Sequence, residues 1–465
     1  MMKSVTSAHV MLVVAASFLY PTRALPQTPA AQAPSAKDEA IPTLRDAPVV
    51  ALTHLRVIDG TGAPKQEDQT LVIEAGKVLA LGRSDQIKVP KNARILDLSG
   101  RTVLPGLVML HEHLFWVYEV VGGVGISHPQ HFSFPRLYLA YGVTTMRTAG
   151  TDFPYMDLNL KRRIDAGQLP GPEIHLTSPY FSGAGDPFVG AMILENGEEA
   201  RRAVRYWAAE GFTSFKAYQW VPKDVLAALI DEAHRLKLPV TAHLRSVSCR
   251  EAAEMGIDNI EHGCFRTMDN LEADLNGPRT QALLRTLVDR NVVLTATPTN
   301  GRRPMPDSSR ELYDPSARER LSSSLASPRP ARPSSGEENP RDTPYAHLIT
   351  GFVKAGGRLV LGSDAGSQGS IPGLADHEAI ENLVKFGFPP IDAIRIATLN
   401  GATFLGIQDR TGSIQVGKEA DLLIVRGDPA ERIEDIENVE MVFANGVPYD
   451  PKTLLGKIKG QVGWQ

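Results

Sequence analysis

The stretch Val103-Leu-Pro-Gly-Leu-Val-Met-Leu-His-Glu-His113 decides how the rest of this sequence is interpreted. A short apolar run over residues 107–110 ends in two histidines that are separated by one residue. In a β-strand, residues i and i+2 point to the same side, so His111 and His113 would present two imidazoles from one strand tip. Imidazole binds zinc and similar divalent ions. A lone His-x-His is equally often a surface or packing pair, so the remaining sequence must decide.

The composition is that of a soluble globular protein, with 42% hydrophobic and 22% charged residues among 465. The formal net charge is −4, and both signs are interspersed along the chain. Because no basic stripe interleaved with aromatic residues occurs, we expect neither a nucleic acid nor an acidic membrane surface as a partner. A homo-oligomer is compatible with this composition.

Residues 1–24 have the three parts of a secretory signal peptide. Lys3 supplies a positive start, residues 10–20 are apolar, and Thr22-Arg-Ala24 offers small residues for cleavage. The apolar run is shorter than the roughly 20 residues that span a bilayer. We therefore expect export across the inner membrane to the periplasm or the medium, without stable membrane insertion after cleavage. An uncleaved tail is the alternative.

Two cysteines, Cys249 and Cys264, are the only ones in the sequence. An exported protein can oxidise such a pair to a disulfide. Two buried thiols explain the same residues equally well, so the sequence leaves the pairing open.

Both ends of the mature chain have strand patterns. Residues 25–48 are rich in Pro and Ala and predict a linker, after which residues 49–103 contain short alternating runs. Residues 411–465 contain two more runs and the turn Asn445-Gly446. We predict one small β-sandwich domain built from residues 49–103 and 411–465.

Residues 104–410 alternate between strand and helix patterns, which indicates a parallel sheet. Eight β segments are expected, at residues 107–110, 142–146, 173–178, 212–218, 239–243, 259–262, 292–297 and 358–362. This count predicts an α/β fold with a (β/α)8 TIM-type barrel, and an open doubly wound sheet is the alternative. Residues 302–341, rich in Pro, Ser and Arg, predict a flexible insert or a lid.

Six polar residues lie at the carboxyl ends of five predicted strands, the face that carries active sites in parallel barrels. They are His111, His113, Lys216, His243, His262 and Asp364. Each has an ordinary explanation, because a strand-end histidine can be a core residue, a lysine can snorkel and an aspartate can cap a helix. Six together favour an active site.

Several segments resemble the metal-site motifs of the amidohydrolase superfamily, in particular its imidazolonepropionase-like and Xaa-Pro dipeptidase-like branch. They are Pro105-Gly-Leu-Val-Met-Leu-His-Glu-His113, Ala242-His243, Ile260-Glu-His-Gly263 and Gly362-Ser-Asp364, with Val57-Ile-Asp-Gly-Thr-Gly62 and Gly412-Ser-Ile-Gln-Val-Gly-Lys-Glu-Ala-Asp-Leu423 at the two ends. The resemblance covers roughly 400 residues, essentially the whole mature chain.

The resemblance implies a site for two divalent metal ions, with zinc as the expected ion. The implied ligands are His111, His113 and Asp364 for the first ion, His243 and His262 for the second, and Lys216, carbamylated by CO₂, bridging both. The alternative for Lys216 is an unmodified side chain beside a single ion.

The resemblance also implies a reaction, in which a metal-bridging hydroxide attacks an amide carbonyl and Asp364 acts as general base and then general acid. Tyr218 shares the strand side of Lys216 and is expected to stabilise the oxyanion, or else to pack at the rim. Arg245 is a candidate for binding a substrate carboxylate, with a surface salt bridge as its alternative. His377, early in a helix after Asp364, is a further candidate for substrate binding.

The expected function is an exported amidohydrolase that cleaves a small-molecule substrate, a dipeptide or an N-acyl amino acid. Gly183-Ala-Gly-Asp186 stands where many relatives carry Gly-Gly-His-Gly, so the metal chemistry is better determined than the substrate. The same site could instead hydrolyse a lactone, a carbamate or a phosphotriester. A non-catalytic scaffold and a nucleobase deaminase are weaker alternatives, the latter because Lys216 does not suit a single-metal site.

Overall fold

The computed structural model describes residues 35–119, 125–264, 277–299, 310–317, 340–366 and 370–463. The predicted signal peptide and most of the predicted insert lie outside the described residues. Among the helices in the described ranges, none has both the length and the apolar character that a membrane crossing requires.

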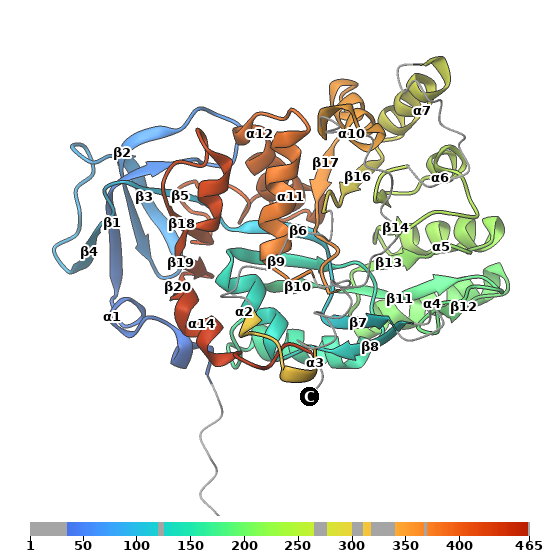
Figure 1. Ribbon diagram of the computed structural model, residues 1–465, viewed down its shortest axis with the longest axis horizontal. Coiled ribbons are helices and arrows are strands. Elements are labelled where there is room, and N and C mark those ends of the chain that lie inside the picture. The colour runs from blue at the N-terminus through green and yellow to red at the C-terminus, as the bar shows by residue number, and fades with distance from the viewer. Residues whose placement is uncertain are drawn as a thin grey trace, which may run out of the picture. The chain divides into compact units, whose positions relative to one another are not determined.

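The strands that carry the predicted site all pair in parallel, in two sheets (Figure 1). The first sheet contains β6 (Leu107–Glu112), β9 (Val143–Thr148) and β10 (Glu173–His175). The second contains β11 (Thr177–Ser182), β12 (Met192–Ile193), β13 (Ser214–Ala217), β14 (Val240–Ala242), β15 (Asn259–Glu261), β16 (Val293–Ala296) and β17 (Leu359–Leu361). One residue separates β10 from β11, and the Asp364 N–H after β17 donates to the His111 carbonyl at 3.0 Å. The arrangement is a TIM-barrel-like α/β fold.

Helices follow most of these strands and cover them from outside (Figure 1). They are α2 (Ser133–Ala140), α3 (Pro154–Asp165), α4 (Gly197–Glu210), α5 (Lys223–Arg235), α6 (Cys249–Met255), α7 (Pro278–Asp289), α10 (Pro344–Lys354), α11 (Leu374–Lys385), α12 (Pro390–Arg395) and α13 (Gly401–Leu405). Helix α4 shows why they form. The Asn196 side chain accepts the first free N–H groups, and Gly211 ends the helix at φ +104°. Its buried residues Ala200, Val204 and Trp207 recur at helical spacing, so they form one apolar stripe.

Apart from the short strands β10 and β12, the parallel strands are buried along their whole length, as expected for a sheet that is covered on both faces. All six residues of β6 are buried, and so are all six of β9. The largest apolar cluster joins these strands to the inner faces of the surrounding helices. The polar residues at the strand ends therefore project from a rigid framework.

Both ends of the chain contribute strands to one further sheet of eight strands, at the left of Figure 1. Its strands are β1 (Val49–Val57), β2 (Gln66–Glu74), β3 (Lys77–Arg83), β4 (Ala93–Asp97), β5 (Arg101–Pro105), β18 (Leu422–Arg426), β19 (Val439–Ala444) and β20 (Val447–Tyr449). Strand β5 pairs antiparallel with β18, which joins the two ends. The predicted turn at Asn445-Gly446 connects β19 and β20. That this sheet forms the two packed layers of a β-sandwich remains a prediction.

The predicted linker is wrong for residues 35–48, which pack against the rest of the chain. The Glu39 carboxylate pairs with both Nε and Nη2 of the Arg136 guanidinium, at 3.0 and 2.6 Å, and Leu44 is buried. Small apolar residues in this stretch fit against the body of the protein, which composition alone did not reveal. This stretch forms two short helices, η1 (Ala36–Glu39) and α1 (Pro42–Arg45).

Residues 310–317 also differ from expectation, because they belong to the segment predicted to be flexible yet are fixed in place. Tyr313 is fully buried, with its ring edge-on to Trp116 at 5.4 Å between centroids. The backbone of Val462 exchanges hydrogen bonds with Leu312 and Asp314, each at 2.9 Å. The C-terminal tail thus anchors this part of the insert beside β7 (Phe115–Glu119), a strand that pairs with β8 (Gly125–Pro129).

Candidate metal centre

The two histidines of the opening motif lie at the carboxyl end of β6, where the strand pattern predicts them. The Nε2 atoms of His113 and His111 lie 3.0 and 3.4 Å from Oδ1 of Asp364. Asp364 follows β17, so two strands that are far apart in sequence place these three side chains together. The His111 side chain is 3% exposed, whereas the Asp364 side chain is 40% exposed and reaches the opening of the site.

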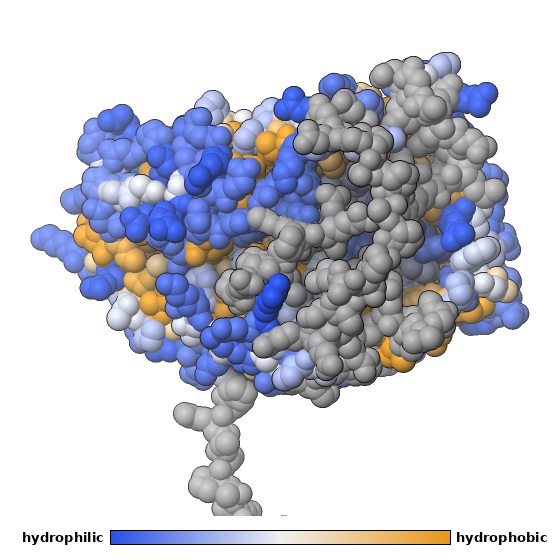
Figure 2. Space-filling model, in the orientation of Figure 1, coloured by the Kyte–Doolittle hydropathy of each residue, from blue (hydrophilic) through white to orange (hydrophobic). Residues whose placement is uncertain are grey.

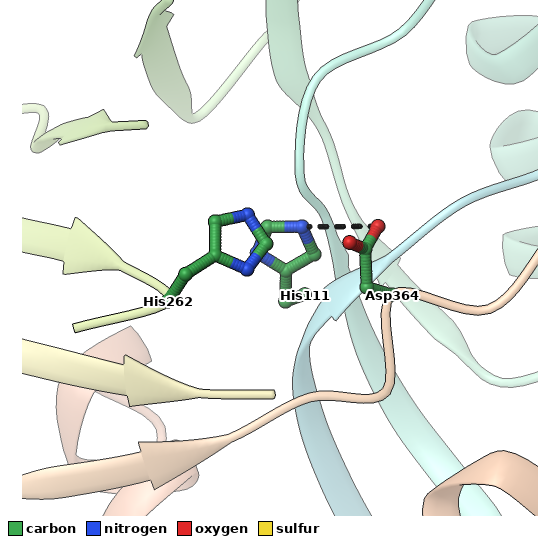
Figure 3. Close-up of side chains that lie close together, drawn as sticks. All are labelled: His111, His262 and Asp364. Carbon is green, nitrogen blue, oxygen red and sulfur yellow. Dashed lines mark ion pairs between the residues drawn. The ribbon is translucent and has the colours of Figure 1, made fainter. Parts of the chain in front are cut away.

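Three of the predicted ligands form a compact group, as Figure 3 shows. His111, His262 and Asp364 each offer one nitrogen or oxygen atom, and these atoms lie within 4.8 Å of one another. His262 and Asp364 adopt the left-handed backbone conformation, with φ of +59° and +53°. Such a conformation costs a residue other than glycine about 1–3 kcal/mol, and it is concentrated at functional sites. The backbone is therefore strained at two of the three positions.

The other predicted ligands surround this group. The His243 ring lies 4.5 Å from the His262 ring between centroids, and Nζ of Lys216 is 3.8 Å from Oε1 of Glu261, the residue before His262. Lys216 belongs to β13, and His243 directly follows β14. The structure thus brings all six predicted ligands to the carboxyl ends of neighbouring strands, and three of them form the compact group.

The fully buried carboxylate of Glu261 contacts His111, a member of this group. Its Oε2 lies 2.7 Å from Nδ1 of His111, and its Oε1 accepts from Nη2 of Arg147 at 2.7 Å. Burial alone would raise the pKa of Glu261, but the charges of Lys216, Arg147 and His111 hold it well below its usual range. Glu261 belongs to the motif Ile260-Glu-His-Gly263, and the sequence predicted no role for it. Its position one residue before a strand-end histidine was the available signal.

Burial and the neighbouring cations keep two of the histidines neutral. Burial, reinforced by Lys216, lowers the pKa of His243 to about 3. Burial, with His111 and His243 nearby, lowers the pKa of His262 well below its usual range. Burial also lowers the pKa of Lys216 to about 8. Neutral imidazoles bind metal ions, so protons do not compete for these two side chains at neutral pH.

The hydrogen bonds of two histidines orient them for a metal ion. Nδ1 of His111 faces Glu261, and Nδ1 of His262 lies 2.8 Å from Oγ1 of Thr297. In both rings Nε2 remains for a metal ion, and a metal-binding histidine ordinarily directs its other nitrogen to such an oxygen. The nitrogen and carboxylate donors suit zinc or a similar divalent ion, so the residues present fit a metal.

Two tyrosines line the opening of the site. The Tyr218 ring lies 5.4 Å from that of His243, next to the group as expected. Tyr180, at the end region of β11, was not predicted, and its hydroxyl is 3.4 Å from Nδ1 of His113. The two tyrosine rings are 5.0 Å apart. In the loop that departs from the family pattern, Asp186 accepts hydrogen bonds from the Ser182 hydroxyl and the Phe188 N–H.

The two predicted substrate-binding residues have different outcomes. Arg245 is exposed, stacks over the Trp220 ring at 5.1 Å and is 3.5 Å from the Gln219 side chain, close in sequence to Tyr218. His377 is fully buried, and its Nε2 is 2.7 Å from the Tyr141 carbonyl. Helix α11 turns this histidine away from the strand-end group, so its prediction as a substrate-binding residue is wrong.

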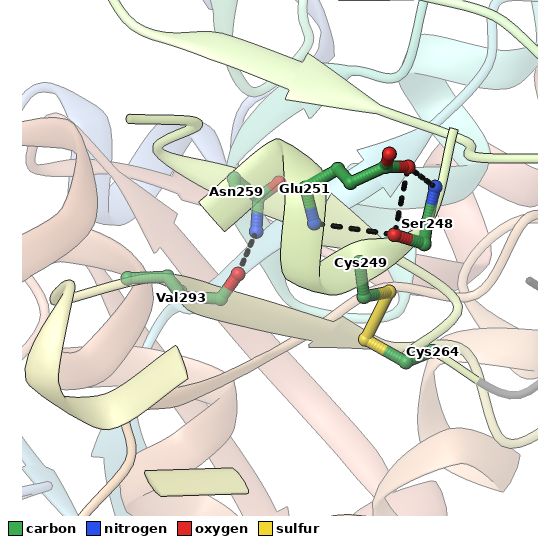
Figure 4. Close-up of a disulfide and its surroundings, with 6 residues drawn as sticks. All are labelled: Ser248, Cys249, Glu251, Asn259, Cys264 and Val293. Atoms are coloured by element: carbon green, nitrogen blue, oxygen red, sulfur yellow. Dashed lines mark hydrogen bonds between the residues drawn. A yellow bond between two sulfur atoms is a disulfide. The ribbon is translucent and has the colours of Figure 1, made fainter. Parts of the chain in front are cut away.

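Cys249 and Cys264 form a disulfide, with 5.9 Å between their Cα atoms (Figure 4). Cys249 begins α6 after the His243 loop, and Cys264 lies two residues after His262. The Ser248 hydroxyl and the Glu251 carboxylate form a capping box at the start of α6. The disulfide therefore ties together the two loops that follow β14 and β15.

Histidine and carboxylate side chains that converge at the carboxyl ends of parallel strands define a metal site of the kind found in TIM-barrel-like hydrolases. Residues 102–448 match the Amidohydrolase family. The chain is 26% identical to an enamidase of Eubacterium barkeri over 378 residues, which cover 78% of this chain and 82% of that one.

Two further matches are consistent with this family. An imidazolonepropionase of Paracoccus denitrificans (strain Pd 1222) is 24% identical over 255 residues, 44% of this chain and 62% of that one. A crystal structure of a Xaa-Pro dipeptidase with bound methionine superposes with a TM-score of 0.67 and 22% identity, covering 86% of this chain and 100% of the other. The chain belongs to the Amidohydrolase family, whose members generally use metal ions, and it is a hydrolase of carbon–nitrogen bonds. The family resemblance seen in the motifs is confirmed.

Proposed function

We propose that this protein is an exported, metal-dependent amidohydrolase that cleaves the amide bond of a dipeptide or an N-acyl amino acid. The observation that carries the proposal is the convergence of His111, His262 and Asp364 within 4.8 Å, at the ends of three strands. Membership of the Amidohydrolase family supports the same bond type. The proposed architecture is a closed (β/α)8 barrel over residues 104–410, flanked by a β-sandwich from residues 49–103 and 411–465.

The proposed cofactors are two divalent ions, zinc being the expected one. His111, His113 and Asp364 would hold one ion, His243 and His262 the other, and a carbamate on Lys216 would link them. Metal ions at this position supply an activated water molecule and polarise the substrate carbonyl. The low pKa of the Lys216 amine, about 8, agrees with a carbamate, because only the neutral amine reacts with CO₂.

Three side chains would act directly on the substrate. Asp364 is ionised and partly exposed, so it would accept the proton of the attacking water and pass it to the leaving amine. The Tyr218 hydroxyl, beside His243, would donate a hydrogen bond to the developing oxyanion. Arg245, at the rim, would bind the substrate carboxylate through its two-pronged guanidinium.

The first experiment is the release of free amino acids from a panel of dipeptides and N-acyl amino acids, with and without a chelator. We expect a restricted set of substrates to be cleaved and the chelator to abolish cleavage. Asp364→Asn should lower kcat by about 10²–10⁴-fold while the protein still unfolds cooperatively. If metal-loaded protein cleaves none of the panel, the amide-hydrolase proposal fails and lactones, carbamates and phosphotriesters become the substrates to test.

The export proposal has separate support. The disulfide between Cys249 and Cys264 is typical of proteins that leave the reducing cytoplasm. Cell fractionation and N-terminal sequencing of the mature protein test it directly. We expect the protein outside the cytoplasm with a new N-terminus after Ala24. Full-length protein in the cytoplasmic fraction would contradict export and leave the hydrolase proposal untouched.

A further inference from the structure

A cleft of about 750 Å³ lies at the amino ends of the parallel strands, opposite the metal centre. It is lined by residues that precede β13, β14, β15 and β17, and by α13 (Gly401–Leu405). None of the six proposed metal ligands is among its lining residues. Its size lies within the range of ordinary small-molecule sites, about 300–1,000 Å³.

The inner wall of this cleft contains an arginine whose hydrogen bonds are incomplete. The Arg147 side chain is 1% exposed. Its Nε and Nη2 donate to the Leu110 carbonyl at 2.9 and 2.6 Å, and Nη2 also reaches Asn259 and Glu261. Within the described part of the chain, no residue accepts a hydrogen bond from the buried Nη1. A buried guanidinium N–H without an acceptor is unfavourable, so this atom requires a water molecule or a ligand.

The cleft offers cationic hydrogen-bond donors for an anion. Lys237 and Arg358 are exposed and line it, against one acidic residue, Asp258. The charge of Arg147 is already paired with Glu261, so Arg147 contributes its free Nη1 donor rather than an uncompensated charge. Asp258 is already engaged, because its Oδ2 faces Nε2 of His234 at 2.9 Å and accepts a backbone N–H at 2.8 Å. Helices α5, α7 and α13 end here, and each helix end carries about half a negative charge. An anion would therefore be bound through direct contacts with these donors rather than through the overall charge of the cleft.

The remaining walls are apolar. The Arg147 guanidinium carbon is 5.3 Å from the centre of the Phe404 ring, and Leu238 and Leu405 line the same space. We propose that this cleft binds a small carboxylate with an apolar body, whose oxygens meet Arg147 and the exposed side chains of Lys237 and Arg358. A planar guanidinium matches a carboxylate in geometry as well as charge, and the ring of Phe404 receives the apolar part.

Benzoate is a suitable test ligand, and its neutral analogue benzamide is the matched control. Calorimetric titration of the holoenzyme should show benzoate binding, with benzamide bound at least tenfold more weakly. Lys237→Asn and Arg358→Gln remove exposed charges and should each weaken benzoate binding about tenfold, because each deletes one charge-assisted contact. Lys237 has φ +59°, a conformation that asparagine tolerates.

Three further variants locate the binding. Arg202→Gln removes an exposed charge on α4, away from the cleft, and should leave the affinity unchanged. Arg245→Gln at the metal-centre rim should also leave it unchanged. Arg147→Lys retains the buried charge but loses the planar guanidinium, so it should weaken benzoate binding. Thermal unfolding of this variant should show that it is still folded.

Several results would overturn the proposal. The cleft is excluded as a carboxylate site if benzoate fails to bind at millimolar concentration. It is also excluded if benzoate binds equally well to the Lys237→Asn/Arg358→Gln double variant. Loss of binding in Arg245→Gln alone would place benzoate at the metal centre. Inorganic phosphate that binds with the same dependence on Lys237 and Arg358, while benzoate does not, would make phosphate rather than carboxylate the recognised group.

Discussion

Two buried glutamates stand next to the histidines of the metal centre, and their surroundings shift their pKa values in opposite directions. Glu112 lies between His111 and His113, and Glu261 directly precedes His262. Both side chains are essentially inaccessible to solvent. The pKa of Glu261 is well below its usual range, whereas the pKa of Glu112 is well above it. Burial is common to both, so their partners must determine the difference.

Glu261 faces cations, and Glu112 faces another acid. Around Glu261, Arg147 and His111 supply hydrogen bonds and positive charge. Around Glu112, burial raises the pKa, and the Asp376 carboxyl raises it further. Burial also raises the pKa of Asp376 to about 6. The pKa of one glutamate is thus lowered by neighbouring cations, and that of the other is raised by burial beside a second acid.

The substitution Glu261→Gln should have the largest effect on stability. It leaves Arg147 and Lys216 without their buried counter-charge, which should lower the free energy of unfolding by about 3–5 kcal/mol. It should also reduce metal retention, because the glutamine amide no longer orients His111. Urea unfolding and metal analysis measure the two effects. Glu254→Gln, on the exposed face of α6, is the control and should change neither quantity.

The Cys249–Cys264 disulfide cross-links the loop that follows Glu261. Among the described residues, no disulfide lies next to Glu112. Replacing both Cys249 and Cys264 by serine removes a cross-link between residues 15 positions apart, which should destabilise the protein by about 3 kcal/mol. Thermal unfolding of wild type and double variant, with and without a non-chelating reductant, measures this. Reductant should shift the wild type alone, and an equal shift in the variant would contradict the assignment.

Glu261 and Asp376, the acid beside Glu112, should also give opposite pH dependences of stability in metal-free protein. Glu261 has a lowered pKa, so its stabilisation is present above its unfolded value near 4.5 and is lost as the pH falls. Asp376 has a raised pKa, so between its unfolded value near 3.8 and about 6 stability declines as the pH rises. The second effect amounts to about 2–3 kcal/mol. Urea unfolding between about pH 4 and 7 tests the second sign, and Asp376→Asn should remove that effect. Unfolding below about pH 4.5 tests the first.

The smallest expected effect is that of Glu112→Gln. A neutral glutamine retains the shape of a protonated glutamate, so its oxygen can accept from Ser363 and its amide can donate to Asp376. We expect a change below about 1 kcal/mol in the free energy of unfolding and nearly normal metal content. A loss as large as that of Glu261→Gln would show that Glu112 is ionised, and the comparison would fail.

The sequence predicted those parts of the site that depend on strand geometry. His111, His113, Lys216, His243, His262 and Asp364 each end or follow a strand, and parallel strands bring such residues to one face. Strand and helix positions in residues 104–410 followed from periodicity in the same way. The paired sheet of both chain ends was also expected, since alternating runs and a hairpin turn signal are local features.

What the sequence did not predict depends on distances between residues far apart in the chain. The pairing of Glu261 with Arg147, 114 residues earlier, has no local signal. The contact of Glu39 with Arg136 likewise has no local signal, and the sequence had left the pairing of Cys249 with Cys264 open. His377 was misplaced because a helix can present any of its faces to a site, and the direction of α11 is set by packing against Tyr141.

The pairing of β5 with β18 constrains when the sheet built from both chain ends can form during synthesis. The Thr102 hydroxyl is hydrogen-bonded to the Gly427 carbonyl, 325 residues later in the chain. During synthesis, strands β1 to β5 emerge first, and the edge of β5 has no partner until nearly all of the polypeptide has followed. An open strand edge readily pairs with another chain. The edge of β5 is therefore open to pairing with another chain until β18 has been made.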